Sequence, residues 1–276
     1  MNARDMQGRV HRSLLTALVL VFGLFPSGAA ASPYDSILAF GDSLSAKTGT
    51  GDGPDGRWSD GPVWVEYLAR RLGVGLTDKA YQETTTAMLL SQVTSYGTIS
   101  GSALVTIWAG GADLAGIVNS YGVSYQEAAH NMNDVIVALI DKGARNFVIP
   151  NLLNIGVIPN VITYSGTAYA SNASTWCQGF NAQLTAYLNN LQSSHSDCTF
   201  YTYDTYAMLT NMVANPKTFG FSNKDAIFYE GFHPSTQTYA YLADQVYSQV
   251  VPLPASLLLF GSGLLGLIGI RRRIRG

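Results

Sequence analysis

Short apolar runs alternate along the chain with longer segments in which apolar residues recur at helical spacing. The apolar runs predict strands at 36–40, 75–80, 103–108, 146–149 and 199–203. The helical patterns cover 62–72, 125–142, 173–191 and 236–250. Alternation of strand and helix is typical of an α/β domain with a parallel sheet. We therefore expect one α/β domain with a central, mostly parallel five-stranded sheet.

Two stretches lack a regular pattern, and we expect them to be irregular. Residues 46–59 are dense in glycine and aspartate, whereas residues 154–171 place apolar residues among turn formers. Long loops of this kind are uncommon unless they are functional. The apolar residues of 154–171 either line an acyl pocket or pack on the edge of the domain, and the sequence leaves both open.

The N-terminus has the order of an export signal. Arginines at positions 4, 9 and 12 precede an apolar block at 13–25, and the small residues Ala29 and Ala31 suit cleavage before Ser32. An uncleaved membrane anchor is the alternative, but the block is shorter than the ~20 residues that span a bilayer. We therefore expect a signal peptide at 1–31 and a mature domain at 32–250.

The C-terminus is also hydrophobic and basic. Residues 253–270 are almost wholly apolar, and four arginines follow them. This pattern predicts a transmembrane helix with the arginines on the cytoplasmic side. Together with the preceding Val-Pro-Leu-Pro-Ala-Ser at 251–256, the segment resembles the PEP-CTERM sorting signal of certain Gram-negative bacteria. That resemblance implies exosortase-type processing of 251–276 and association with extracellular polysaccharide; a plain tail anchor is the alternative.

Charge and cysteine content narrow the possible functions. Between the two ends, Asp and Glu outnumber Lys and Arg, which disfavours nucleic-acid binding. Cys177 and Cys198 are the only cysteines, and an even pair in an exported protein favours a disulfide. However, helical rise between them predicts a separation of ~20 Å, beyond disulfide reach. The pairing stays open, and these residues with four scattered histidines do not suggest a metal site.

A serine and a histidine are the candidates for chemistry. Ser43 lies in Gly41-Asp42-Ser43-Leu44, directly after a predicted strand. In open α/β sheets, ligands bind at the carboxyl ends of the strands. His233 precedes the final helix, from which a base can reach this edge. Taken alone, Ser43 is also consistent with an ordinary turn, and His233 with an exposed loop residue.

Taken with further motifs, these residues resemble the SGNH/GDSL family of lipases and esterases. The agreement includes residues 56–69, 108–114, 143–145, 150–152 and 233–234 in the family's order. The resemblance implies a three-layer α/β/α flavodoxin-like fold and hydrolysis or transfer of an acyl ester without a cofactor. It assigns Ser43 as nucleophile, His233 as general base and Glu230 as the acid that orients the histidine.

The chain departs from the family pattern around the oxyanion hole. Gln82 and Glu83 replace two glycines, and Ala112 replaces the asparagine in the block Gly111-Ala112-Asp113. Loss of one oxyanion donor typically costs ~100- to 1,000-fold in rate. The N–H groups of Ser43 and Leu44 remain as expected donors, and the Gln82 amide is a speculative substitute.

Two functions follow from these observations. The first is an exported hydrolase or acyltransferase acting on a lipid or an acylated polysaccharide, located in the cell envelope or outside the cell and initially anchored by the C-terminal helix. The second is a non-catalytic matrix or polysaccharide-binding protein on the same scaffold. Ser43 and His233 favour the first, and the altered oxyanion residues favour the second.

Overall fold

The computed structural model describes residues 32–118 and 123–251. Its centre is a five-stranded parallel sheet in the order β2-β1-β3-β4-β5. Of these strands, β1 and β3 are almost wholly buried because helices cover both faces of the sheet. The strand bounds are β1 Ser36–Gly41, β2 Gly75–Asp78, β3 Leu104–Trp108, β4 Asn146–Val148 and β5 Thr199–Tyr201.

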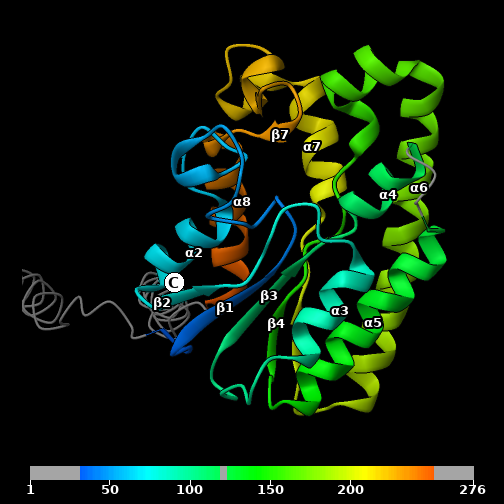
Figure 1. The fold of residues 1–276 in the computed structure, drawn as a ribbon. Coiled ribbons are helices and arrows are strands. Elements are labelled where there is room, and N and C mark those ends of the chain that lie inside the picture. The colour runs from blue at the N-terminus through cyan, green and yellow to red at the C-terminus, as the bar shows by residue number, and fades with distance from the viewer. Residues whose placement is uncertain (1–31, 119–122, 252–276) are drawn as a thin grey trace, which may run out of the picture. The chain divides into compact units, whose positions relative to one another are not determined.

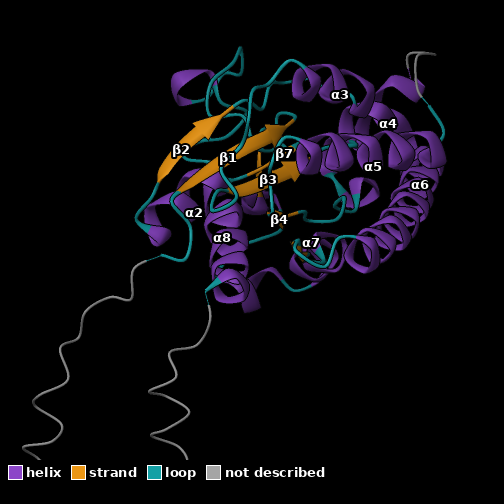
Figure 2. Cartoon of the chain, turned by 90° about the horizontal axis from the view of Figure 1, so that it is seen from below, coloured by secondary structure: helices purple, strands orange, loops and turns teal. Residues whose placement is uncertain are grey.

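Helices form a layer on each side of the sheet (Figures 1 and 2). Helix α2 (Trp64–Leu72) packs with α8 (Thr236–Val250) on one face, and α3 (Thr86–Thr94), α5 (Tyr125–Asp141) and α6 (Pro159–Ser194) cover the other. The three-layer α/β/α architecture and the five-stranded parallel sheet are confirmed. The remaining elements are α4 (Gly111–Val118), α7 (Thr205–Ala214), the antiparallel pair β6 (Phe228–Tyr229) and β7 (His233–Pro234), and the 3₁₀ helices η1 (Pro54–Gly56), η2 (Ile155–Val157), η3 (Pro216–Phe219) and η4 (Asp225–Ile227).

Helix α2 begins two residues later than its sequence pattern predicts. A Glu66 carboxylate oxygen accepts from the Val63 N–H at 2.9 Å, so Val63 is the cap. Asp60, which precedes this helix, accepts from the N–H of Thr236 at 2.7 Å. Asp60 therefore satisfies the first N–H of α8, which packs against α2.

The prediction that residues 154–171 are irregular is wrong. They contain η2 and the first turns of α6, which continues to Ser194 with one break at Gly166. Gly166 has φ +81° and ψ 165°, a conformation that is essentially restricted to glycine. The turn-forming residues of this stretch thus mark a kink in a long helix.

Both cysteines are free and buried. Cys177 lies within α6, whereas Cys198 directly precedes β5. Burial raises the pKa of the Cys177 thiol to about 12. This thiol therefore stays protonated and packs as a small apolar group.

Candidate active site

Ser43 lies in a tight turn at the carboxyl end of β1. Gly41 adopts φ +146°, and a side chain there would overlap the Trp108 carbonyl group. The Asp42 carbonyl then accepts from the N–H groups of Ser45 and Ala46, both at 3.1 Å. These contacts turn the chain at the sheet edge and leave Ser43 half-buried beside a cavity.

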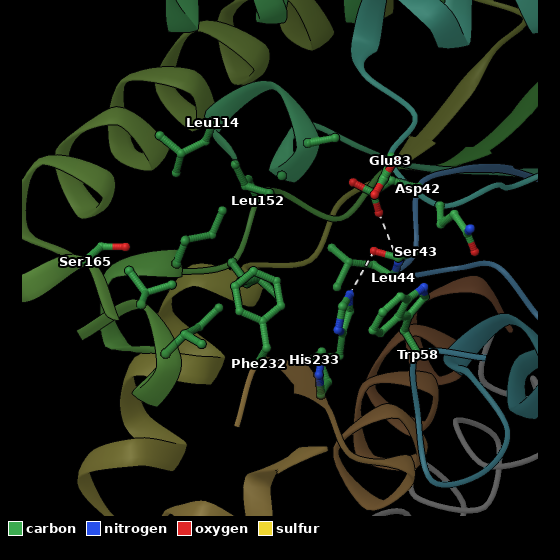
Figure 3. Close-up of a pocket in the computed structure, with 18 of the residues that line it drawn as sticks. Asp42, Ser43, Leu44, Trp58, Glu83, Leu114, Leu152, Ser165, Phe232 and His233 are labelled. Carbon is green, nitrogen blue, oxygen red and sulfur yellow. Dashed lines mark hydrogen bonds between the residues drawn. The ribbon is translucent and has the colours of Figure 1, made fainter. Parts of the chain in front are cut away.

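His233 reaches this turn from the antiparallel pair β6–β7. Its Nε2 lies 2.9 Å from Ser43 Oγ, as Figure 3 shows. The Trp58 ring stacks on the imidazole at 5.1 Å, and the Phe232 ring meets it edge-on at 5.0 Å. These contacts restrict the orientation of the imidazole from both sides.

Burial makes His233 a neutral group. Desolvation lowers its pKa to about 4, because an imidazolium loses hydration between the aromatic rings. A neutral imidazole with its proton on Nδ1 can accept the Ser43 hydroxyl proton at Nε2. The pair therefore has the geometry and protonation state of a nucleophile and its base.

The structure does not bring the expected acid, Glu230, onto His233. In the described residues no hydrogen bond joins the two side chains, and desolvation is the sole cause of the His233 pKa shift. Glu230 is exposed and has φ +52°. After desolvation, the nearby Glu230 carboxylate is the main cause that raises the pKa of Tyr229. The left-handed backbone at Glu230 thus accompanies a carboxylate close to Tyr229.

Two of the expected oxyanion donors are already engaged. The Leu44 N–H donates to Asp42 Oδ1 at 3.0 Å. The Gln82 amide holds the loop before α2, because its Oε1 accepts from the Thr50 N–H at 2.7 Å and its Nε2 donates to the Thr50 hydroxyl. Neither group is free to meet an oxyanion in this arrangement.

Glu83 adopts the backbone conformation expected of the glycine that it replaces. Its φ is +58°, a left-handed value that non-glycine residues adopt at a cost. Among the described residues, the N–H groups of Ser43 and Glu83 have no hydrogen-bond partner. Both residues line the cavity, and the Glu83 side chain is exposed. Their N–H groups are therefore available to donate to an oxyanion.

The block at the start of α4 divides into two parts. Gly111 and Ala112 line the cavity, and Ala112 presents only a methyl group to it. Asp113 is buried and accepts from the Thr86 N–H at 2.9 Å and the Thr86 hydroxyl at 2.8 Å. Asp113 therefore anchors the start of α3, and no contact places it in the cavity.

Asp42 is a second buried carboxyl group beside the nucleophile. Burial, followed by the nearby charge of Asp113, raises its pKa to about 7. Its hydrogen bond from Leu44 N–H limits this rise. The sequence motif contains Asp42, but its complete burial depends on the packed structure.

A cavity of about 760 Å³ extends from Ser43 and has a largely apolar wall (Figure 3). Residues 155, 158 and 161 belong to the stretch for which the sequence left pocket and packing open. These three side chains are buried and also line the cavity, so they do both. The apolar lining comprises Leu114, Leu152, Leu153, Ile155, Ile158, Val161 and Tyr169.

The pairing of Trp58 and Phe232 with His233 was not predicted. Trp58 lies in a matching motif, and Phe232 is the neighbour of the histidine in sequence. The aromatic residue directly before the histidine and the tryptophan in the matching motif were the features of the sequence that could have indicated this packing. In the described ranges, no cluster of three or more His, Cys, Asp or Glu side chains is placed to hold a metal ion.

Comparison with known proteins identifies the family. The profile of GDSL-like lipases/acylhydrolases matches residues 37–246. This chain belongs to the GDSL-like lipase/acylhydrolase family. A second profile, the PEP-CTERM protein-sorting motif, matches residues 250–273. Apart from Ser36, the GDSL match covers every residue of the five-stranded sheet, and it includes both members of the Ser43–His233 pair.

Curated members of the GDSL family from Arabidopsis thaliana are similar over part of their length. One GDSL esterase/lipase is 25% identical over 160 residues, which cover 45% of this chain and 44% of the plant protein. Another is 24% identical over 242 residues, or 74% of this chain and 65% of that protein. The chain thus spans less than two thirds of these relatives.

Solved GDSL structures share the fold at low identity. A lipolytic G-D-S-L family protein from Veillonella parvula has a TM-score of 0.53 and 16% identity, covering 78% of this chain and 97% of that one. An acetylxylan esterase from Geobacillus stearothermophilus, solved as a catalytic mutant, has a TM-score of 0.54 and 12% identity, covering 79% and 95%. These similarities support the α/β fold and leave the substrate open.

Neither expected terminal segment is part of the described structure. The predicted signal peptide at 1–31 and the predicted transmembrane helix at 253–270 lie outside it. Within the ranges that the structure covers, no helix is both long and apolar enough to cross a bilayer. The sorting motif therefore rests on sequence alone.

Proposed function

We propose that this protein is a serine hydrolase that cleaves carboxylic esters of medium or long acyl chains. The 2.9 Å approach of His233 Nε2 to Ser43 Oγ, at the mouth of an apolar cavity, carries the proposal. An acetyl group would leave most of this cavity unfilled. A longer acyl chain would bury apolar surface against Leu114, Leu152 and Ile158.

The reaction follows from this pair. His233 Nε2 takes the Ser43 hydroxyl proton while Oγ bonds to the ester carbonyl carbon. When the tetrahedral intermediate collapses, the bond to the alkoxide breaks and His233 gives its proton to the alcohol. Water then repeats the sequence on the acyl-enzyme, which releases the carboxylic acid and restores Ser43; an alcohol in place of water would give acyl transfer.

Oxyanion stabilisation is the weak part of this site. The free N–H groups of Ser43 and Glu83 supply two donors, and the Ala112 side chain supplies none. Without a third donor, we expect a rate ~100- to 1,000-fold below that of a site with an asparagine there. This loss is smaller than a typical enzymatic enhancement of at least ~10⁶, so slow ester hydrolysis remains expected.

The sorting motif supports export to the cell envelope. In this proposal the segment 1–31 directs export, an exosortase-type enzyme processes the tail, and the 253–270 segment anchors the protein in the membrane beforehand. The esters would then come from lipids or acylated polysaccharides outside the cytoplasm.

Covalent labelling tests the nucleophile directly. Purified protein is expected to react with a fluorophosphonate probe and to hydrolyse p-nitrophenyl octanoate faster than p-nitrophenyl acetate. Ser43→Ala should abolish both activities, whereas Ser45→Ala changes a buried serine of the same turn and should retain labelling. Equal labelling of wild type and Ser43→Ala would contradict the proposal and favour the non-catalytic alternative.

A further inference from the structure

A second cavity, of about 330 Å³, adjoins the catalytic one at His233. The residues that line both cavities are Trp58, Val161, Ser165, Phe232 and His233, so the two spaces meet between the imidazole and the start of α6. Tyr164, Asn160 and Glu230 line only the second. Both cavities have largely apolar walls, and the second is distinguished by the Tyr164 ring next to the polar side chains of Asn160 and Glu230.

The position of this cavity relates it to the alcohol half of an ester. In the proposed reaction His233 gives a proton to the departing alcohol, which must then lie next to Nε2. The acyl chain occupies the apolar cavity on the side of Gly111 and Leu114. The space beyond His233 that remains for the alcohol is the second cavity.

The lining suits a sugar ring. Tyr164 is 80% exposed and Phe232 is 40% exposed, although large aromatic side chains are usually covered. Flat rings offer contact area to the C–H face of a pyranose. The Glu230 carboxylate can accept hydrogen bonds from hydroxyl groups. Rings beside a few polar groups form a site for a ligand that is apolar on its faces and polar at its edges.

The polar groups of this cavity have fixed positions. Asn160 donates its Nδ2 hydrogen bond to the Glu230 carbonyl at 2.7 Å, and its N–H donates to the Gly231 carbonyl at 3.0 Å. These bonds join the start of α6 to the loop before β7. The backbone of Glu230 and Gly231 is thereby held at the rim, so binding requires little ordering of the backbone.

Charge argues against an anionic ligand. Among the described residues that line this cavity, Glu230 is the one charged side chain, because His233 is neutral. The Glu230 carboxylate repels phosphate. Residues 146–196, which include all of α6, contain no Asp, Glu, Lys or Arg. Attraction to anionic lipid surfaces requires clustered Lys or Arg. The α6 side of the cavity is therefore uncharged, and the described lining has no Lys or Arg to attract an anion, so the cavity fits a neutral ligand.

We propose that the second cavity binds the alcohol half of the ester and that this alcohol is a neutral sugar. The inference rests on the proposed ester hydrolysis and extends it to the leaving group. Tyr164 is the binding residue that distinguishes this site, since it lines the second cavity and not the one that contains Ser43.

Three octanoyl esters with different alcohols test the inference: those of glucose, glycerol and methanol. We expect the highest kcat/KM for the glucose ester. Tyr164→Ala should lower kcat/KM for this ester roughly tenfold, the order of one aromatic contact, mainly through KM. The methyl ester should be unaffected, and Tyr164→Phe should retain the preference. Tyr81→Ala is the matched control, because Tyr81 is 52% exposed and lines neither cavity.

The outcomes separate this inference from the proposed function. Hydrolysis of all three esters with equal kcat/KM, or with glycerol preferred, overturns the sugar site and leaves the esterase intact. An equal loss on all three in Tyr164→Ala also overturns it, because the residue would then act on the fold. If no ester is hydrolysed, saturation-transfer NMR measures the binding of cellobiose to Ser43→Ala protein. Cellobiose signals that weaken when Tyr164→Ala is added to this variant support the sugar site. The absence of cellobiose signals from the Ser43→Ala protein overturns it.

Discussion

Ala112 lines the cavity at the position where the family pattern has an asparagine. Ala112→Asn is expected to raise kcat on p-nitrophenyl octanoate, from severalfold up to about a hundredfold, because a preorganised donor stabilises the transition state more than the substrate. Steady-state kinetics with the purified variant measures the change. Ala112→Leu adds similar bulk without a donor and should not raise kcat; a gain in both variants would attribute the effect to packing.

The pH dependence of the reaction reports the surroundings of His233. Burial lowers its pKa to about 4, so the neutral, basic form predominates at pH 5 and above. We expect kcat/KM to stay level from pH 8 down to about pH 5, and then to fall about tenfold per unit below pH 4. A midpoint near the ordinary value of 6.5 would mean that a carboxylate, such as Glu230, approaches the imidazole in solution.

Asp42 makes a contribution to stability that decreases as pH rises. Its folded-state pKa of about 7 lies above the ordinary 3.8, so the folded protein binds a proton more tightly than the unfolded chain does. The stabilisation is complete below pH 3.8 and is lost as the pH rises through about 7. Relative to wild type, Asp42→Asn should gain up to about 4 kcal/mol in unfolding free energy between pH 4 and 8.

Urea unfolding at these two pH values measures the gain. The asparagine side chain of this variant keeps an oxygen that can accept from the Leu44 N–H, so the turn is retained. Asp35→Asn is the control: Asp35 is exposed, and hydrogen bonds from Ser102, Ser36 and Ser100 lower its pKa. Its removal should therefore give no gain at high pH. A parallel gain in the two variants would contradict the assignment to burial.

At the level of the element, the kink in α6 positions the wall of the acyl cavity. Gly166→Ala should destabilise the protein by about 1–3 kcal/mol, because alanine disfavours φ +81° with ψ 165°. No atom lies within 4 Å of the added Cβ, so the cost is confined to the backbone. If the first turns of α6 straighten in response, Val161 and Ser165 move, and activity on octanoyl esters falls.

Gly73→Ala is the matched control for the kink. Gly73 also has positive φ, at +69°, and open space around it, but it ends α2 away from the cavity. It should lower the melting temperature without changing the preference for octanoyl over acetyl esters. Loss of that preference in both variants would mean that global stability, rather than the kink, sets chain-length selectivity.

Prediction from sequence succeeded where a local pattern determines the element. The strand at 104–108 is a continuous apolar run, and the helix at 236–250 has apolar residues at helical spacing. Both form as expected. The stretch 154–171 failed because Pro159 and Gly166 are common turn residues, yet the first starts α6 and the second kinks it. Local composition did not distinguish a helix that is kinked by a glycine from a segment that has no helix.

At the scale of the whole molecule, the candidate site depends on contacts between distant segments. The order of Ser43 and His233 along the chain indicated that they meet, because parallel strands bring their carboxyl ends to one edge. The direction of the Glu230 carboxylate depends on a backbone angle that composition does not reveal. The hydrogen bond between the Gln82 side chain and Thr50 depends on the path of the chain between these two residues. Pairing was therefore predictable, whereas side-chain direction was not.

Asn160 links helix α6, which lines the apolar cavity, to the loop that carries His233. Its two hydrogen bonds, to the carbonyl groups of Glu230 and Gly231, connect the first turn of α6 with the residues immediately before His233. A chain that presses against Ile158 and Val161 therefore pushes on a segment coupled to the imidazole. In the proposed reaction, acyl length would then affect the alignment of the proton transfer as well as the affinity, and thus kcat as well as KM.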